Sequence, residues 1–321
     1  MWREICAALG AFVVMFWNVE NLFDPFDDPL KNDDEFTARG ERHWTWQRFE
    51  SKCDGIAQTI VAVADQTGEL PALVGLAEVE NRFVVSHLAR KTLLSELGYG
   101  FVHRESPDER GIDVALLYRK DRFRVLAVDS LRIPGFATRD ILHVTGTVIP
   151  DNVIPGLTRD LTRDPLHIFV VHLPSKRGGT KATESRRDAA LSTLSSALDS
   201  LLSDNPESRI IVMGDFNDTA PVIPGNVIPG LTPTGIPGLT RDNGTLKYHG
   251  RWEQIDHFFL SPAEDSPSDT ANTPEMQVFA PEFLLEPDKS YLGKKPRRTY
   301  VGPRYNGGLS DHLPIILKLC H

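Results

Sequence analysis

A carboxylate and an amide stand two residues apart at the end of one apolar run. The run Arg209-Ile-Ile-Val-Met213 is followed by Gly214-Asp-Phe-Asn217. Because side chains alternate along an extended chain, Asp215 and Asn217 can point the same way off the end of a buried strand. An acceptor or base beside a neutral amide suits a phosphate and its attacking water. The same four residues are equally typical of a simple turn, so the pair alone decides nothing.

Polar residues stand at or beside the edges of other expected strands in the same way. Carboxylates could hold a hard divalent cation through oxygen, as Mg²⁺ prefers, and one carboxylate could orient or deprotonate a water. Histidines and asparagines could stabilise charge on phosphoryl oxygens. Each residue alone is more typical of a structural role, but the set is what a metal-dependent phosphoester hydrolase needs: Asn18, Glu20, Glu78, His172, Asp215, Asn217, Asp256, Asp311 and His312.

Competing chemistries lack their motifs. The sequence has no Gly-x-Ser-x-Gly elbow, no His-Glu-x-x-His helix, no Walker loop and no Gly-x-Gly-x-x-Gly fingerprint. A net charge of −9 argues against bulk electrostatic binding to nucleic acid, although it allows a local basic groove. The basic stretch 294–298 could grip phosphates or be a solvated loop. Three cysteines without a Cys-x-x-Cys motif fit a reducing compartment or a fold that needs no disulfides.

The elements that must position these residues follow from hydrophobic periodicity. Three helices are expected, over residues 45–66, 83–97 and 185–202. Strands are expected over residues 11–19, 73–76, 100–103, 112–118, 125–131, 141–148, 166–171, 209–213, 252–260 and 313–319. His143 is expected to alternate outward on its strand, and it is given no role.

The start of the chain has two interpretations. Residues 5–17 are nearly all apolar and follow Arg3, which resembles the apolar core of a secretory signal. No small-x-small cleavage site follows, and cleavage would remove part of the first expected strand. We therefore interpret the stretch as a lead-in plus a buried strand and predict a cytoplasmic protein, with a secreted form as the alternative. The stretch is too short to span a membrane, so we expect no stable membrane insertion.

Two stretches contain related Pro/Gly-rich sequences. Val-Ile-Pro-Gly-Leu-Thr recurs near residues 151–165 and 221–242. The copies are short and irregularly spaced, unlike the regular period of a solenoid. Because long insertions in surface loops cost little stability, we interpret both stretches as insertions with no part in the chemistry. Deleting residues 152–160 is expected to leave activity intact.

Six short motifs occur in an order that resembles the endonuclease/exonuclease/phosphatase family, the superfamily of deoxyribonuclease I-like enzymes. The motifs are Phe16-Trp-Asn-Val-Glu20, Leu76-Ala-Glu-Val79, Val171-His172, Met213-Gly-Asp-Phe-Asn217, Ile255-Asp256 and Ser310-Asp-His312. The resemblance covers about residues 12–319 and implies an α/β fold. That fold is a four-layer α-β-β-α sandwich, in which two mostly antiparallel sheets pack face to face with outer helices. We expect one catalytic domain over residues 1–321, monomeric, with the two repeat-like loops inserted.

The resemblance also implies a metal site. Glu78 would be the principal Mg²⁺ ligand, supported by Asn18, Glu20 and Asp311, with Mn²⁺ as an alternative ion. The sequence leaves open whether one metal or two are bound.

The remaining site residues would act on water and phosphate by the same resemblance. Asp215 would orient and activate the water, and Asn217 would hold the phosphate or the water. His312, paired with Asp256, would contact the scissile phosphate and stabilise the pentavalent transition state. His172 would bind phosphate or protonate the leaving group.

The substrate is a phosphoester of undecided kind. The first interpretation is a phosphodiesterase or endonuclease-like enzyme, with nucleic acid as one candidate partner. The alternative is a phosphomonoesterase or a lipid-headgroup, sphingomyelinase-like phosphodiesterase at the same site; a non-enzymatic binding module is disfavoured because every catalytic position is filled. Lys176 and Arg177, in a Gly-rich loop after His172, are expected to bind the substrate. Further candidate contacts are Glu80, Asn81, Arg110, Asp113 and Arg139.

Overall fold

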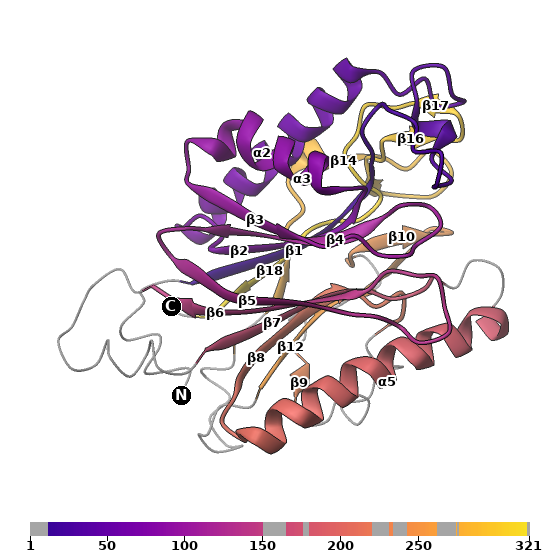
Figure 1. Cartoon of the computed structure of the whole chain (residues 1–321). Coiled ribbons are helices and arrows are strands. Elements are labelled where there is room, and N and C mark those ends of the chain that lie inside the picture. The colour runs from indigo at the N-terminus through magenta and orange to yellow at the C-terminus, as the bar shows by residue number, and fades with distance from the viewer. Residues whose placement is uncertain are drawn as a thin grey trace.

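Two six-stranded sheets pack face to face, with helices on both outer faces (Figure 1). This computed structural model describes residues 12–149, 165–175, 180–219, 231–233, 243–261, 274 and 276–319. The arrangement confirms the predicted four-layer sandwich. Nearly all of both repeat-like stretches, 151–165 and 221–242, lies outside the described residues, so their interpretation as insertions stays a prediction.

The first sheet has one parallel pair at its centre. β1 and β2 run parallel, and all other neighbours are antiparallel. Helix α2 (Trp46–Thr67) connects the parallel pair, as a parallel connection requires. In sheet order the strands are β13 (Met276–Val278), β18 (Ile315–Lys318), β1 (Val13–Leu22), β2 (Leu73–Val79), β4 (Asp113–Arg119) and β3 (Tyr99–His103).

The second sheet repeats this plan. β7 and β8 are its parallel pair, connected by helix α5 (Thr180–Asp204), and the other neighbours are antiparallel. In sheet order the strands are β5 (Phe123–Leu131), β6 (Ile141–Val148), β7 (Leu166–His172), β8 (Arg209–Asp215), β12 (Asp256–Leu260) and β9 (Thr232–Pro233). Both sheets are therefore mostly antiparallel, as predicted.

Short elements decorate the edge of the sandwich. Three two-stranded hairpins and three 3₁₀ helices occur among the described residues. The hairpins pair β10 (Leu246–Tyr248) with β11 (Arg251–Glu253), β14 (Leu285–Pro287) with β15 (Lys294–Pro296), and β16 (Tyr300–Val301) with β17 (Arg304–Tyr305). The 3₁₀ helices are η1 (Asp34–Phe36), η2 (Leu93–Ser95) and η5 (Glu282–Leu284).

Two expected elements are shorter than predicted. The helix expected over residues 83–97 is α3 (Arg82–Lys91), which ends because Thr92 is extended and caps η2 through its side chain. The strand expected over 252–260 is divided, because β11 pairs with β10 while β12 belongs to the large sheet. Local periodicity could not show either break, since the apolar pattern continues through both.

Three apolar layers hold the sandwich together. Residues such as Phe16, Met213 and Phe258 fill the space between the sheets, and separate cores lie under α2 with α3 and under α5. A Cβ built on Gly75 would lie 2.8 Å from the sulfur of Met213, so a side chain on β2 at this point would have to displace Met213 where the sheets approach closely. Burial of this extent supplies most of the folding free energy.

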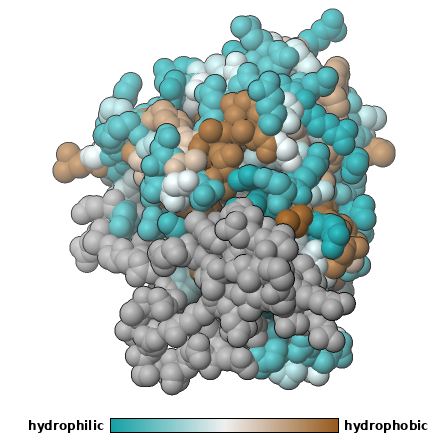
Figure 2. Space-filling view, turned by 90° about the vertical axis from the view of Figure 1, so that its left-hand side faces the viewer, coloured by the Kyte–Doolittle hydropathy of each residue, from teal (hydrophilic) through white to brown (hydrophobic). Residues whose placement is uncertain are grey.

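The face of the molecule in Figure 2 is mostly hydrophilic where its residues are described, with hydrophobic residues gathered near its centre. No helix in the described part of the chain is long and apolar enough to cross a membrane. His143 points away from the layer between the sheets, as predicted. It stacks on Phe169, with ring centroids 4.3 Å apart, and its Nε2 lies 3.1 Å from Nδ1 of His167.

Candidate active site

The carboxyl ends of the two parallel pairs meet at one edge of the sandwich. Asn18 near the end of β1 donates its side-chain N–H to Oδ2 of Asp215, at the end of β8 in the other sheet, over 3.0 Å. The site therefore lies across the seam between the sheets, and neither sheet alone could form it.

Asp215 is held in one orientation and is fully buried. Its Oδ1 accepts the backbone N–H of Asn217 at 2.8 Å. Asn217 has a φ of 50° and donates its side-chain N–H to the carbonyl of Leu173 at 2.9 Å. The turn and the site that the sequence suggested as alternatives are both present. Burial, and then repulsion from Asp256, raise the pKa of Asp215 to about 7.

His312 and Asp256 form a buried pair opposite Asp215. Nδ1 of His312 lies 2.9 Å from Oδ2 of Asp256, and its Nε2 lies 3.9 Å from Oδ2 of Asp215. Burial alone would lower the pKa of His312, but the Asp256 carboxylate outweighs it and holds that pKa well above the usual value. The geometry gives His312 a cationic ring whose Nε2 is directed into the site.

The backbone around His312 is fixed from the first sheet. Its N–H donates to Oγ of Ser310 at 2.9 Å, and its carbonyl accepts the indole N–H of Trp17 at 2.9 Å. The Ser310 hydroxyl donates in turn to the carbonyl of Asn18 at 2.6 Å. The C-terminal motif is thus bonded to β1, nearly the whole chain length away.

His172, at the end of β7, has the opposite electrostatic environment. Its Nε2 lies 3.6 Å from Asp215 Oδ2 and 4.0 Å from Glu78 Oε1. Burial, followed by the positive charges of Arg139 and Arg110, lowers its pKa well below the usual value. Its Nδ1 is buried and has no hydrogen-bond partner among the described residues. The two histidines therefore differ in charge near neutral pH.

Glu78, the predicted metal ligand, lies near the end of β2 and faces His172. It has a φ of 62°, and its Oε2 accepts the backbone N–H of Asn21 at 2.9 Å. Positive φ values at non-glycine residues cost free energy and gather at functional sites. Oε1 faces His172 at a distance too long for a hydrogen bond. A hard oxygen directed into a polar cluster is the kind of donor that Mg²⁺ uses.

Glu20 is turned away from this cluster. Its Oε1 accepts two hydrogen bonds from Arg298, at 2.9 and 2.7 Å, and its Oε2 accepts the backbone N–H of Thr299 at 2.9 Å. Arg298 also pairs with Asp311, at 3.0 Å. Burial, and then Asp311, raise the pKa of Glu20 to about 7, although Arg298 opposes them.

Lys52 is a buried cation beneath the same residues. Its ammonium donates to the carbonyl of Glu20 and, over 2.7 Å, to Oγ1 of Thr299. Burial lowers its pKa to about 8, and Glu20 opposes the shift. Sequence reasoning missed Lys52, although it lies three residues after Phe49 on the apolar face of α2. The sequence signal for Lys52 was a charged residue at a position where the helical period places apolar ones.

The structure brings nine of the predicted residues to this edge and leaves two untested. Lys176 and Arg177 lie outside the described residues, so their substrate role stays a prediction. The nine are Asn18, Glu20, Glu78, His172, Asp215, Asn217, Asp256, Asp311 and His312.

Two groups of three described residues have potential ligand atoms within 4.8 Å of one another. One is the group Asp215, Asp256 and His312, which overlaps the expected catalytic residues rather than the expected metal ligands. The predicted ligand Glu78 belongs to neither group, so its role in metal binding stays a prediction. The other group, His103, Glu105 and Asp113, supports a loop, since Asp113 accepts the backbone N–H of Ser106 at 3.0 Å.

Two other candidate contacts have structural partners. Asn81 caps α3 by accepting the backbone N–H of Val84 at 3.0 Å. Glu80 accepts the backbone N–H of Asp24 at 2.6 Å and is buried beside it. Asn81 therefore starts a helix, and Glu80 supports the loop that contains Asp24.

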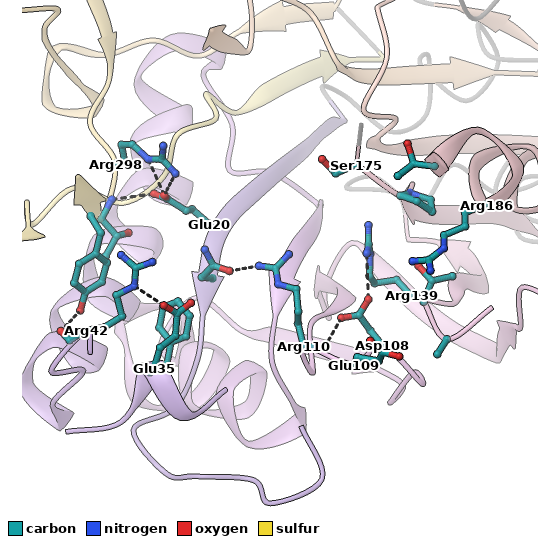
Figure 3. Close-up of a pocket in the computed structure, with 18 of the residues that line it drawn as sticks. Glu20, Glu35, Arg42, Asp108, Glu109, Arg110, Arg139, Ser175, Arg186 and Arg298 are labelled. Carbon is teal, nitrogen blue, oxygen red and sulfur yellow. Dashed lines mark hydrogen bonds and ion pairs between the residues drawn. The ribbon is translucent and has the colours of Figure 1, made fainter. Parts of the chain in front are cut away.

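An arginine-rich cleft of roughly 640 Å³ opens beside these residues (Figure 3). Arg139 pairs with Asp108 at 3.1 Å, and its Nε is buried without a partner among the described residues. Arg186 lies over the ring of Phe136. Five arginines face four acids in the lining: Arg42, Arg110, Arg139, Arg186 and Arg298, with Glu20, Glu35, Asp108 and Glu109. Such a lining suits an anionic ligand.

Known proteins share this sequence pattern and fold. A model of the endonuclease/exonuclease/phosphatase family matches residues 13–226 and 229–321. A search of curated protein sequences finds no match.

Many solved structures share the fold at low sequence identity. A TDP2 from D. rerio, complexed with a single-strand DNA product, is 17% identical with a TM-score of 0.56, over 96% of this chain and 98% of that one. A TDP2 from C. elegans is 16% identical with a TM-score of 0.58, over 97% and 76%. A mannosyl-6-phosphatase from Bacteroides thetaiotaomicron is 16% identical with a TM-score of 0.57, over 95% and 98%. At these identities the likeness concerns the fold alone.

Proposed function

Since the chain belongs to the endonuclease/exonuclease/phosphatase family of phosphoester hydrolases, we propose that it is a Mg²⁺-dependent phosphodiesterase. The observation that carries the proposal is the arrangement of Asp215 against the His312–Asp256 pair. One side chain can address a water, and the other carries positive charge toward the same space. Hydrolysis of a phosphodiester needs both functions at once.

Asp215 is suited to orient the water and to take its proton. A base works best when its pKa lies near the working pH, and burial brings the pKa of Asp215 to about 7. Asn18 and the backbone of Asn217 hold its two oxygens, so the carboxylate has one orientation. The proton it accepts then stays within a buried network.

His312 is suited to stabilise negative charge on the phosphoryl oxygens. Its Nδ1 is bonded to Asp256, which fixes the ring and leaves the Nε2–H to point into the site. A preorganised cation in a water-poor site stabilises developing charge strongly. The neutral His172 is suited to hydrogen-bond the phosphate or the leaving group rather than to add a second charge.

The chemistry of the donor set fits a hard divalent ion. Glu78 would hold the ion, with Asn18, Glu20 and Asp311 as the other expected ligands. When bound, such an ion polarises a phosphoryl oxygen and neutralises charge on it. Mg²⁺ is proposed because only oxygen ligands are offered, and Mn²⁺ would be an alternative by the same argument.

The arginine-rich cleft supports a substrate with charge beyond the scissile phosphate, as in a nucleic-acid strand. In the shared fold, one solved structure contains a single-strand DNA product and another is a mannosyl-6-phosphatase. A phosphomonoesterase is the second candidate, because paired acids in the cleft leave little net positive charge to hold a long polyanion. Paired arginines recognise a compact phosphate well.

A substrate panel tests the proposal. Plasmid DNA, single-stranded DNA, RNA, sphingomyelin and sugar or inositol phosphates would be incubated with the enzyme and Mg²⁺, with EDTA, and with the Asp215→Asn variant. We expect turnover of a phosphodiester that EDTA and the variant both abolish. Turnover of monoesters alone would select the second candidate, and activity unaffected by EDTA would refute the mechanism.

A further inference from the structure

Arg298 lies between two carboxylates that were expected to hold a metal. Its Nε and Nη2 both donate to Oε1 of Glu20, and its Nη2 also lies 3.0 Å from Oδ2 of Asp311. The Arg298 guanidinium therefore bridges the pair as a cation would. In Figure 3 it meets Glu20 on one side of the cleft, apart from Arg110 and Arg139.

Both carboxylate oxygens of Glu20 are already engaged. Oε1 accepts from Arg298, and Oε2 accepts the backbone N–H of Thr299 at 2.9 Å. A carboxylate that ligates a divalent ion must direct an oxygen lone pair at it. Glu20 would have to give up charge-assisted hydrogen bonds to do so, and these are among the stronger ones in proteins. In Glu78 only Oε2 is engaged, by the Asn21 N–H and, at 3.9 Å, by Arg110, whereas Oε1 lies 4.0 Å from His172, too far for a hydrogen bond to it.

The charges around Glu20, Glu78 and Asp311 also favour the binding of one divalent ion. Glu20, Glu78 and Asp311 are three acids, and three cations lie against them: Arg298, Lys52 and Arg110, whose Nη2 lies 3.9 Å from Oε2 of Glu78. These formal charges balance, so one divalent ion would supply two positive charges for a phosphate anion. A second divalent ion would leave four positive charges in a largely buried site, where unpaired charge is costly.

We propose that Arg298 is the resident cation between Glu20 and Asp311, so that the enzyme binds a single divalent ion, on the Glu78 side. The proposal rests on the proposed metal-dependent function and changes the expected ligand set. Glu20 and Asp311 act through Arg298 as positioning residues, and Lys52 supports them from beneath through the Glu20 carbonyl and Thr299. The guanidinium holds the two carboxylates in place of a second metal.

Mn²⁺ titration of the metal-free full-length protein tests this directly, by calorimetry and by the electron paramagnetic resonance signal of free Mn²⁺. We expect one site per wild-type chain and its loss in Glu78→Gln. Arg298→Met should expose the carboxylate pair and add a second, weaker site. Arg297→Met is the matched control, because the side chain of this neighbour donates to the carbonyl of Asn306, and it should keep one site. Two sites in the wild type, or no gain in Arg298→Met, would overturn the proposal.

Glu20→Gln keeps the inference testable if Arg298→Met fails to fold. If Glu20 is not a ligand, Glu20→Gln should leave the Mn²⁺ dissociation constant within about threefold of wild type, whereas loss of a direct oxygen ligand should weaken it at least about tenfold. A tenfold loss would contradict the proposal. The stoichiometry is independent of turnover, so an enzyme with two sites and full activity would refute only this inference. A protein with one site and no hydrolysis of any substrate would refute only the proposed function.

Discussion

Asp215 and Asp256 lie directly opposite each other on antiparallel β8 and β12, and each faces a different nitrogen of His312. Two carboxylates in register would normally repel and destabilise the sheet. The imidazolium between them offsets this repulsion. Burial first, and then Asp256, raise the pKa of Asp215, and Asp256 holds the pKa of His312 well above its usual value; the proposed hydrolysis uses both properties.

Replacing His312 should separate catalysis from folding. We expect His312→Ala to lower kcat by roughly 10² to 10³, because it removes the charge preorganised at the phosphoryl oxygens. The far-ultraviolet circular dichroism spectrum should match that of the wild type. His257→Gln is a matched control, since this neighbour of Asp256 contacts Gln254 and the Asp218 carbonyl and should retain most activity. A His312→Ala enzyme within about threefold of wild type would refute the assignment.

Asp215→Asn should inactivate the enzyme while stabilising its fold. The pKa of Asp215 is raised to about 7 in the folded protein, above its value in the unfolded chain. Ionising this carboxyl at neutral pH therefore costs free energy in the native state. A neutral isostere avoids that cost but turns its amide nitrogen toward one of the two N–H donors that hold Asp215, so we expect a net gain of about 1 kcal/mol or less. Urea denaturation in EDTA at pH 7.5 measures the change. A less stable variant would contradict the electrostatic account, whatever its activity.

Acid should weaken the second sheet through His143. Burial, followed by His167, lowers the pKa of His143 to about 4, below its unfolded value. A depressed histidine pKa contributes stability that is present above about pH 6.5 and is lost as the pH falls toward 4. The loss by pH 5 should be ~2 kcal/mol. His143→Gln should show a smaller loss than wild type in urea denaturation at pH 7.5 and pH 5, and an equal loss would count against this origin.

Glu80 should act with the opposite sign. Burial, and then Asp24, raise its pKa to about 9. A raised carboxyl pKa contributes stability that is fully present below about pH 4.5 and declines as the pH rises through the folded value. Glu80→Gln should therefore melt at a higher temperature than wild type at pH 8.5, and at a similar temperature near pH 4.5. Equal melting temperatures at both pH values would show that the carboxyl is not protonated in the fold.

The sheets and most of the site follow from local patterns. Apolar runs that end in a polar residue located β2, β7 and β8 and the functional residues at their ends, Glu78, His172 and Asp215. The prediction succeeds because a strand buried in the core must be apolar along its length, and because the carboxyl ends of parallel strands lie at one edge of a sheet. The C-terminal motif around His312 could be placed beside β1 only through the family resemblance.

The period of two failed at the end of β1. The alternation predicts that Asn18 and Glu20 share a face, yet Asn18 bonds to Asp215 while Glu20 bonds to Arg298. The φ of Glu20 is 47°, and the pairing register shifts between Asn18 and Leu22, which redirects the side chains. A bulge of this kind has no local sequence signal here, and Arg298 lies too far along the chain for any pattern to predict the contact.

The bond from the Trp17 indole to the His312 carbonyl spans 295 residues, so two segments far apart in the sequence must meet to complete the site. β1 also pairs with β18, so the first sheet depends on the same long-range association. Contacts so distant in sequence are slow to form. A nascent or C-terminally truncated chain would hold Glu78, His172 and Asp215 but no His312. Hydrolytic activity is therefore expected only from a chain that includes the segment around His312.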